Sequence, residues 1–282
     1  MASAIPSQPG AYPSADTTAR PSRAAQAATD LVVGLGKSWL WGEIAKQDIR
    51  LRYRGSMLGP FWLTLSTAIM IGSMGFLYAK LFHSPASSYL PFLTVGLVIW
   101  QFLASLITEG CGTFTAVSSV IQQVPMPYSV HVYRLVYRNL LVLAHNCLIV
   151  PIVLWVFHIS PDWRVLWIPP ALLVLCLNGV WISILFGMLA ARFRDVTPIV
   201  GSFVQVVFFV TPIFWRPDAL GNWKALGELN PLFAAIDVVR APVLGIPLAP
   251  YSWLVLLVVT LLGCGVTFAV FARLRYRIPF WV

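Results

Sequence analysis

Three arginines stand at alternate positions, Arg50, Arg52 and Arg54, immediately before a long apolar stretch. A guanidinium group binds phosphate oxygens through two parallel N–H donors, whereas the ammonium group of lysine acts as a point charge. The triplet therefore predicts a phosphate-binding site at the edge of an apolar segment. Two alternatives stay open, because arginines at such a junction also set the orientation of a membrane protein and contact anionic lipids.

Few other ionisable groups lie inside apolar segments. Glu109 is the one acid there, and a buried carboxylate in such a segment is a common proton or cation site. It stands one turn from the end of its segment, where interfacial water reaches, so it favours ion-coupled transport only weakly. Of the four histidines, only His145, which Asn146 follows in another segment, would demand a partner when buried, and for it we expect a helix-to-helix hydrogen bond rather than catalysis.

Neither a metal site nor a nucleotide site is indicated. The four cysteines show no CxxC spacing and are expected to be packing residues: Cys111, Cys147, Cys176 and Cys264. Residues 34–38 end in Gly-Lys-Ser, as a phosphate-binding loop does, but that loop needs a glycine where Leu31 stands. If nucleotide hydrolysis powers this chain, another subunit must supply it.

Aromatic residues recur along the apolar segments and at their ends. An aromatic face stacks on the C–H surface of a sugar ring, so some of these residues are candidates to line a passage. Interface belts and helix packing are the alternative. The candidates for the passage are Trp62, Trp100, Phe102, Phe208, Phe209 and Phe214.

The composition is that of a membrane protein. Hydrophobic residues make up 59% of the 282 residues, charged residues 10%, and the mean hydropathy is +0.80, whereas about a quarter of the residues are charged in a soluble domain. The net charge of +9 does not indicate nucleic-acid binding, because the basic residues lie at the ends of apolar segments rather than in one patch.

Six apolar segments approach or exceed the ~20 residues that a helix needs to cross a ~30 Å hydrocarbon core. The predicted fold is all-α and polytopic. The fifth segment is the shortest and runs into Thr211-Pro212. The predicted spans are 58–81, 91–112, 139–157, 165–191, 199–215 and 252–271.

The basic residues set the orientation, since Lys and Arg are retained in cytoplasmic loops. With both termini in the cytoplasm, only five of the 19 Lys and Arg residues fall on the outer side. These five are Lys80, Arg164, Arg216, Lys224 and Arg240. The opposite orientation would invert this bias.

The N-terminal region divides in two. Residues 1–36 are predicted to be a disordered cytoplasmic tail, because the first 30 are rich in Ala, Ser, Pro and Thr and lack the apolar core of a signal peptide. Residues 37–282 form the membrane domain. Residues 39–54 predict an amphipathic helix in the membrane interface, with a solvated connector as the alternative. Asp48 and Arg52 interrupt its apolar side.

Prolines and charges break the outer connection between residues 216 and 251, so it predicts short helices that dip into the outer leaflet. Asn230-Pro231 is a helix start, with Asn as the cap. Asp237 and Arg240 are expected to pair at i,i+3 before Pro242 stops the helix.

From about Trp39 to the C-terminus, the chain resembles the membrane subunits of ABC-2 type exporters of the polysaccharide and O-antigen class. The order and spacing of five pieces carry the resemblance. They are Arg-Tyr-Arg-Gly-Ser-Met-Leu-Gly-Pro-Phe-Trp at 52–62, Pro-Met-Pro at 125–127, Ala-Arg-Phe-Arg-Asp-Val at 191–196, Thr-Pro-Ile-Phe at 211–214, and Leu-Asn-Pro-Leu at 229–232 followed by Arg240.

The resemblance implies a multi-pass permease of the bacterial cytoplasmic membrane. It would pair with a second copy and two separate ATPase subunits, which bind ATP and Mg²⁺, and would export a lipid-linked glycan; no cofactor is expected in this chain. The arginine triplet would attract the lipid headgroup, and the aromatic passage would guide the sugar chain. The residues expected to couple to the ATPase are Glu43, Gln123, Pro125, Met126 and Pro127.

Two other classes stay open. An ABC-2 exporter of a teichoic-type polymer, a lipid or a drug would share this architecture. A membrane transferase acting on lipid-linked sugars would share the substrate, but such enzymes normally cluster acids or histidines at one face.

Overall fold

The computed structural model describes residues 22–57, 59, 61–83 and 85–282. These residues form helices and no strands, which agrees with the predicted fold class. The helices and short 3₁₀ turns are α1 (Arg23–Gly36), α2 (Ser38–Arg52), α3 (Phe61–Leu81), α4 (Ala86–Cys111), η1 (Thr115–Val117), α5 (Ser118–Gln123), α6 (Ser129–Asn146), α7 (Ile149–Val156), η2 (Trp163–Trp167), α8 (Ile168–Arg192), α9 (Val196–Val210), η3 (Pro217–Trp223), α10 (Lys224–Glu228), α11 (Pro231–Leu244), α12 (Ser252–Leu274), η4 (Arg275–Arg277) and α13 (Ile278–Trp281).

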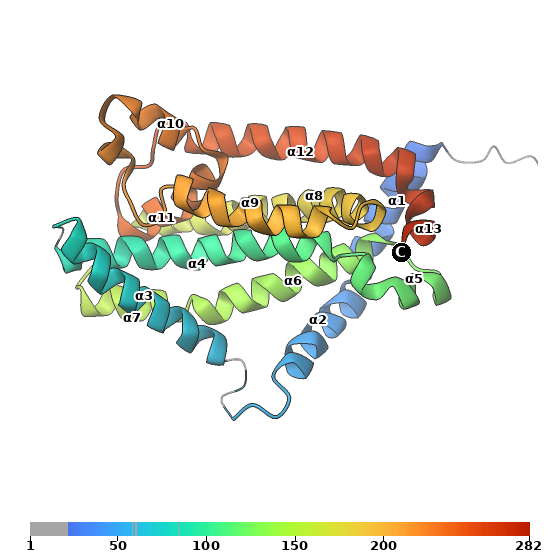
Figure 1. The fold of residues 1–282 in the computed structure, drawn as a ribbon, viewed down its shortest axis with the longest axis horizontal. Coiled ribbons are helices and arrows are strands. Elements are labelled where there is room, and N and C mark those ends of the chain that lie inside the picture. The colour runs from blue at the N-terminus through green and yellow to red at the C-terminus, as the bar shows by residue number, and fades with distance from the viewer. Residues whose placement is uncertain (1–21, 58, 60, 84) are drawn as a thin grey trace, which may run out of the picture.

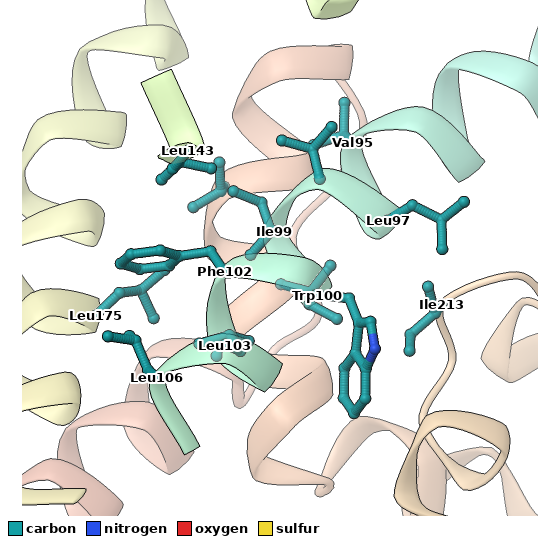
Figure 2. Close-up of a cluster of buried hydrophobic side chains, with 14 of the residues drawn as sticks. Val95, Leu97, Ile99, Trp100, Phe102, Leu103, Leu106, Leu143, Leu175 and Ile213 are labelled. Atoms are coloured by element: carbon teal, nitrogen blue, oxygen red, sulfur yellow. The ribbon is translucent and has the colours of Figure 1, made fainter. Parts of the chain in front are cut away.

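Helix α4 is the centre of the bundle (Figure 1). It is largely apolar and mostly buried, as expected of a central helix, and α3, α6, α7, α8, α9 and α11 all pack against it. Figure 2 shows its side chains pointing in several directions, toward Leu143 of α6, Leu175 of α8 and Ile213. The other helices are therefore positioned by their contacts with α4.

Five helical stretches are long and apolar enough to cross a membrane. Three of the predicted spans agree with them to within about five residues at the ends that the structure describes. The span 252–271 matches α12, which ends at Leu274, and η4 and α13 extend this stretch to Trp281. The predicted span 139–157 is part of a longer stretch, because α6 begins ten residues earlier and α7 continues it after a turn at Cys147–Leu148. The five stretches are Phe61–Leu81, Ala86–Cys111, Ser129–Val156, Trp163–Arg192 and Ser252–Trp281.

The predicted helical span 199–215 is wrong in its last five residues, 211–215. Helix α9 ends at Val210, and its 15 residues reach about 22 Å at 1.5 Å per residue. Thr211 takes an extended conformation (ψ 134°), because a following proline disfavours helical geometry in the residue before it. Residues 211–215 continue without a helix.

The structure also corrects the predicted tail, because residues 23–36 form α1; residues 1–21 lie outside the described residues. Ala27, Asp30 and Gly34 are buried on one face of α1, which packs on α6 and α12. The Asp30 carboxylate accepts hydrogen bonds from the Ser129 backbone N–H at 3.1 Å and from Arg275 at 3.1 Å. The start of α1 and the C-terminus therefore lie at one end of the bundle (Figure 1), as the charge bias predicts.

Helix α2 packs along α6. Ala45 and Ile49 of its predicted apolar side are buried, while Leu51 is exposed. Asp48 and Arg52 do not interrupt the packing, because each forms an ion pair with a neighbouring helix. The sequence pattern found the helix but not the partners of its charged residues.

The outer connection forms η3, α10 and α11, as short helices were expected there. Asn230 caps α11, and its side-chain oxygen accepts from the N–H groups of Leu232 and Phe233. The expected Asp237–Arg240 pair is wrong, since each side chain bonds outside its own helix. The expected stop at Pro242 is wrong as well.

Helix α11 runs past that proline to Leu244. It ends where Gly245 takes a φ of 64°, a left-handed conformation that glycine adopts without steric cost.

Candidate functional site

A groove of about 700 Å³ lies among α3, α4, α6 and α9. Helices α3 and α9 both pack on α4. Ser66 and Met70 of α3 and Gln205 and Phe209 of α9 are exposed lining residues, so the groove opens between these two helices. The lining residues are Arg52, Leu63, Ser66, Thr67, Met70, Leu97, Val98, Trp100, Gln101, Phe102, Ala104, Ser105, Thr108, Glu109, Asn139, Val142, Leu143, Asn146, Val204, Gln205, Phe208 and Phe209.

Four of the six aromatic residues predicted for a passage line this groove: Trp100, Phe102, Phe208 and Phe209. The rings of Trp100 and Phe208 are 5.5 Å apart, and those of Phe208 and Phe209 are 5.3 Å apart. The remaining two are placed elsewhere.

Phe214 does not line the groove; it packs behind the aromatic wall, with its ring 5.5 Å from that of Phe208. Trp62 is 53% exposed on α3, away from the groove. Phe214 is therefore a packing residue and Trp62 a surface residue, and neither belongs to the aromatic wall of the groove.

Uncharged polar residues, most of which the sequence reasoning did not select, also line the groove. The Gln101 side-chain oxygen accepts from the Thr67 hydroxyl at 3.0 Å and from the Asn146 amide at 3.1 Å. The second bond joins α6 to α4. The available signal was the occurrence of Gln and Asn inside apolar segments.

The helix-to-helix hydrogen bond expected for the His145 ring is wrong. One ring nitrogen contacts Leu141 O within α6 at 2.7 Å. Cys111 lies in the core, and Cys147 and Cys176 pack against it, which confirms their role as packing residues.

An ion-pair network closes one end of the groove. The Glu109 carboxylate accepts from Arg138 at 2.7 Å, from Asn139 at 2.9 Å and from Arg52 at 3.5 Å. Asp48 accepts two hydrogen bonds from Arg134, at 2.6 and 2.5 Å. Because opposite charges and donors surround Glu109, its role in this state is to link α2, α4 and α6 rather than to bind a free cation.

Only one of the three arginines of the triplet lies at the groove. Arg52 lines it. Arg50 and Arg54 are exposed, and within the part of the chain that the structure describes they have no side-chain partner. Gly55 and Gly59 follow with φ values of 85° and 55°, which turn the chain from α2 toward α3.

The predicted coupling residues lie on the surface near one end of the bundle. Glu43 is exposed on α2 and pairs with Lys46 at 3.6 Å. Gln123 ends α5, Pro125 is exposed after it, and residues 126–127 are half-buried. Figure 1 shows α5 at the end where α1 and the C-terminus lie, with α2 running from that end.

The opposite end carries a polar pocket of about 540 Å³ beside η3 and α10. Lys224 bonds Asp218 at 2.8 Å and Glu228 at 3.4 Å. The hydrogen bond with Asp218 is the main reason that the pKa of Lys224 is raised.

The arrangement suits a ligand with both hydroxyl groups and apolar faces. Amide and hydroxyl side chains offer donors and acceptors, the aromatic rings offer flat apolar surfaces, and the arginines at one end offer donors for an anion. A purely apolar ligand would leave the polar lining without partners.

Three relatives are similar over most of their length. Two O-antigen export system permease proteins RfbA of Klebsiella pneumoniae are 25% and 26% identical, over 240 and 243 residues, covering 83% of this chain and 91% of each relative. An O-antigen export system permease protein RfbA of Myxococcus xanthus is 21% identical over 201 residues, covering 70% of this chain and 77% of the relative.

Residues 40–244 match the family described as ABC-2 type transporter. This range includes α3 to α11 and all the helices that line the groove. With more than half of its length matched, the chain belongs to the ABC-2 type transporter family.

Proposed function

We propose that this protein is the membrane subunit of an ATP-driven exporter that moves a lipid-linked polysaccharide of the O-antigen kind across the bacterial cytoplasmic membrane. One observation carries the proposal: a groove among apolar spanning helices is lined by both aromatic rings and uncharged hydrogen-bonding side chains. Sugars need both kinds of contact, and the relatives' names point the same way.

A sixth crossing completes the path of the chain. Helix α9 is followed by the non-helical residues 211–215, which bend and together with α9 make this crossing. Non-helical backbone is tolerated at membrane depth when it is buried in protein. Arg240 donates to the carbonyls of Pro212 and Ile213, and Tyr89 donates to that of Phe214.

A second copy of the chain covers the open side of the groove. Apolar side chains flank the opening on both helices, for example Ile69 of α3 at 59% exposure and Phe203 of α9 at 64%. Lipid chains would leave the side-chain amide of Gln205 without hydrogen-bond partners, whereas a second copy brings its own polar lining against it.

ATP and Mg²⁺ bind to two separate ATPase subunits, which dock at the end where α1, α5 and the C-terminus lie. Glu43, Gln123 and residues 125–127 provide surface contacts there. Because α2 is tied to α4 and α6 by ion pairs, a movement of α2 would reach the groove directly. Arg50, Arg52 and Arg54 attract the anionic headgroup of the substrate.

The experiment is export in a strain whose own gene has been deleted. The wild-type chain should co-purify with an ATPase subunit and restore surface polysaccharide. Gln101→Leu should assemble with the ATPase but lose most export, because it removes hydrogen-bonding capacity from the middle of the groove. The control is Ser202→Leu, on the exposed side of α9 outside the groove.

Three results would contradict the proposal. They are unchanged surface polysaccharide in the deletion strain, failure to recover any ATPase subunit with the wild-type chain, and full export by the Gln101 variant. A different accumulated polymer in the deletion strain would assign the chain to another substrate of this family.

A further inference from the structure

His131 is a buried histidine with no partner for its ring. It stands in the first turn of α6 with 4% of its surface exposed. Neither ring nitrogen has a hydrogen-bond partner among the residues that the structure describes. Buried polar groups are nearly always satisfied, so this ring indicates that a polar group is missing from its surroundings.

The space for such a group is a second cavity, of about 230 Å³, which His131 lines. This is far more than the roughly 10–15 Å³ that one water requires, so a ligand of several non-hydrogen atoms fits. Its walls come from the end of α4, from η1 and from α6. The lining residues are Arg52, Glu109, Gly112, Thr113, Ala116, Val117, His131, Arg134, Leu135 and Arg138.

The charges of this cavity favour an anion, since three guanidinium groups and one carboxylate line it. Arg134 is held by Asp48 and Arg138 by both Asp48 and Glu109. Arg52 is the freest of the three, because its side chain is 48% exposed and its contact with Glu109 is long at 3.5 Å. It can therefore change partner most easily.

We propose that this cavity binds a phosphate or diphosphate group. A ring N–H of His131 donates to a phosphate oxygen, Arg52 leaves Glu109 to bind the anion, and Arg134 and Arg138 add donors and charge. The Glu109 carboxylate competes for the same guanidinium groups. Arg52 and Glu109 line both the groove and this cavity, so a group bound here lies at the inner end of the groove.

Two sources can supply this chemistry: the headgroup of a lipid diphosphate, or free inorganic phosphate. Assignment to the headgroup rests on the proposed function, whereas the anion site itself does not. The test is therefore a binding measurement on the purified full chain in lipid nanodiscs, which requires neither export nor an ATPase subunit.

The measurement is calorimetric titration with inorganic pyrophosphate and with geranyl diphosphate, a short lipid diphosphate. The wild-type chain should bind with one site per chain. His131→Phe keeps the ring shape but removes both nitrogens, and it should weaken binding about tenfold or more, as expected for one hydrogen bond to a charged group. Arg52→Gln should weaken binding as well.

Glu109→Gln should change the affinity in the opposite direction. It removes the competing charge while the amide oxygen still accepts from Asn139, so both probes should bind more tightly. Opposite signs at Arg52 and Glu109 separate a true anion site from a general loss of structure. His131→Gln, which retains a donor, should bind better than His131→Phe.

Two matched controls should bind as the wild-type chain does. Arg273→Gln removes one exposed arginine from α12, and His83→Asn changes an exposed histidine at a left-handed position (φ 51°) that asparagine tolerates. Tighter binding of geranyl diphosphate than of pyrophosphate supports a lipid headgroup, and the reverse supports free phosphate. No binding of either probe, or binding that His131→Phe and Arg52→Gln leave unchanged, overturns the proposal.

Discussion

At the scale of single residues, Arg240 explains how the backbone can be irregular deep inside the bundle. Its side chain is fully buried and donates to two carbonyl groups at 3.1 and 3.2 Å. It also lies over the ring of Phe92, at 3.9 Å from the centroid. A charged group in this position stabilises carbonyls that no helix satisfies, so residues 211–215 can remain non-helical.

Arg240→Met should therefore destabilise the fold strongly, by about 2–4 kcal/mol, because it leaves two buried carbonyls without donors. The measurement is the loss of the monodisperse protein on heating in detergent. Arg216→Met is the matched control, because Arg216 also faces the Phe92 ring, at 5.2 Å, but is exposed. Equal losses in both variants would mean that the carbonyl contacts are unimportant.

At the scale of elements, helices α8 and α12 meet through a small residue and a large one. Gly263 of α12 lies directly against the Trp181 ring, where a Cβ atom would collide with it. The Trp181 N–H donates to Asn178, whose amide donates to Thr260 of α12 at 2.7 Å. Close approach and hydrogen bonding therefore act together at this contact.

Gly263→Val should lower stability by about 1–3 kcal/mol through overpacking, measured as a lower thermal midpoint in detergent. Gly265→Val is the control two residues along the same helix, where an added Cβ meets nothing within 4 Å. That variant should stay near the wild-type midpoint. The packing account fails if the two variants lose stability equally.

The pairing of α2 with α6 is the second contact between elements that can be measured. Asp48 and Arg134 are 16% and 22% exposed in a bidentate pair, whereas Glu43 and Lys46 are about half exposed. A double-mutant cycle of Asp48→Asn and Arg134→Gln should give a coupling energy of about 1–3 kcal/mol. The cycle of Glu43→Gln and Lys46→Gln should give about 0.5 kcal/mol or less. A coupling near zero for the first pair would show that α2 is not held by it.

At the scale of the whole molecule, the side of the bundle that carries α3 is largely uncovered by other helices. In the most apolar stretch of α3, only 17% of the residues are buried within the bundle, compared with 72% in that of α4. The groove opens on this side, and polar residues line it. The exposed side of α12, by contrast, is an apolar surface suited to lipid, with Leu261 at 71% exposure.

A bifunctional thiol reagent should therefore cross-link two chains that carry Ile69→Cys and Phe203→Cys, in a background in which the four native cysteines are replaced. Leu261→Cys in the same background should remain uncross-linked. The readout is the dimer band after treatment in membranes. Cross-linking from α12 but not from α3 and α9 would place the second copy on the other side.

Local signals predicted a large part of the fold. The helix start at Asn230-Pro231 was correct, because a cap acts within three residues of itself. The end of α9 and the helix at residues 23–36 were missed for different reasons. The first depends on Pro212 and on carbonyl partners such as Arg240, and the second on contacts between Asp30 and residues about 100 and 245 positions away.

For the candidate site, the sequence predicted the kinds of residue but not which of them meet in space. Arg52 and four of the six predicted aromatic residues line the groove. Gln101, Asn139 and His131 were not predicted, because a single polar residue within an apolar segment does not reveal which helix it will face. Arg52 meets Glu109 and Asp48 meets Arg134 across 57 and 86 positions. Nothing in either segment alone identifies the partner.

The apolar runs and the arginines at their ends were sufficient to establish a polytopic helical membrane protein, because hydrocarbon requires long apolar helices and basic loops are retained on one side. Which polar residues meet inside the bundle was decided by the packing of α3, α6 and α9 around α4. Helical periodicity indicates which residues lie on the same face of one helix. It does not indicate which other helix that face will contact. The groove and the cavity at His131 exist only once those contacts have formed.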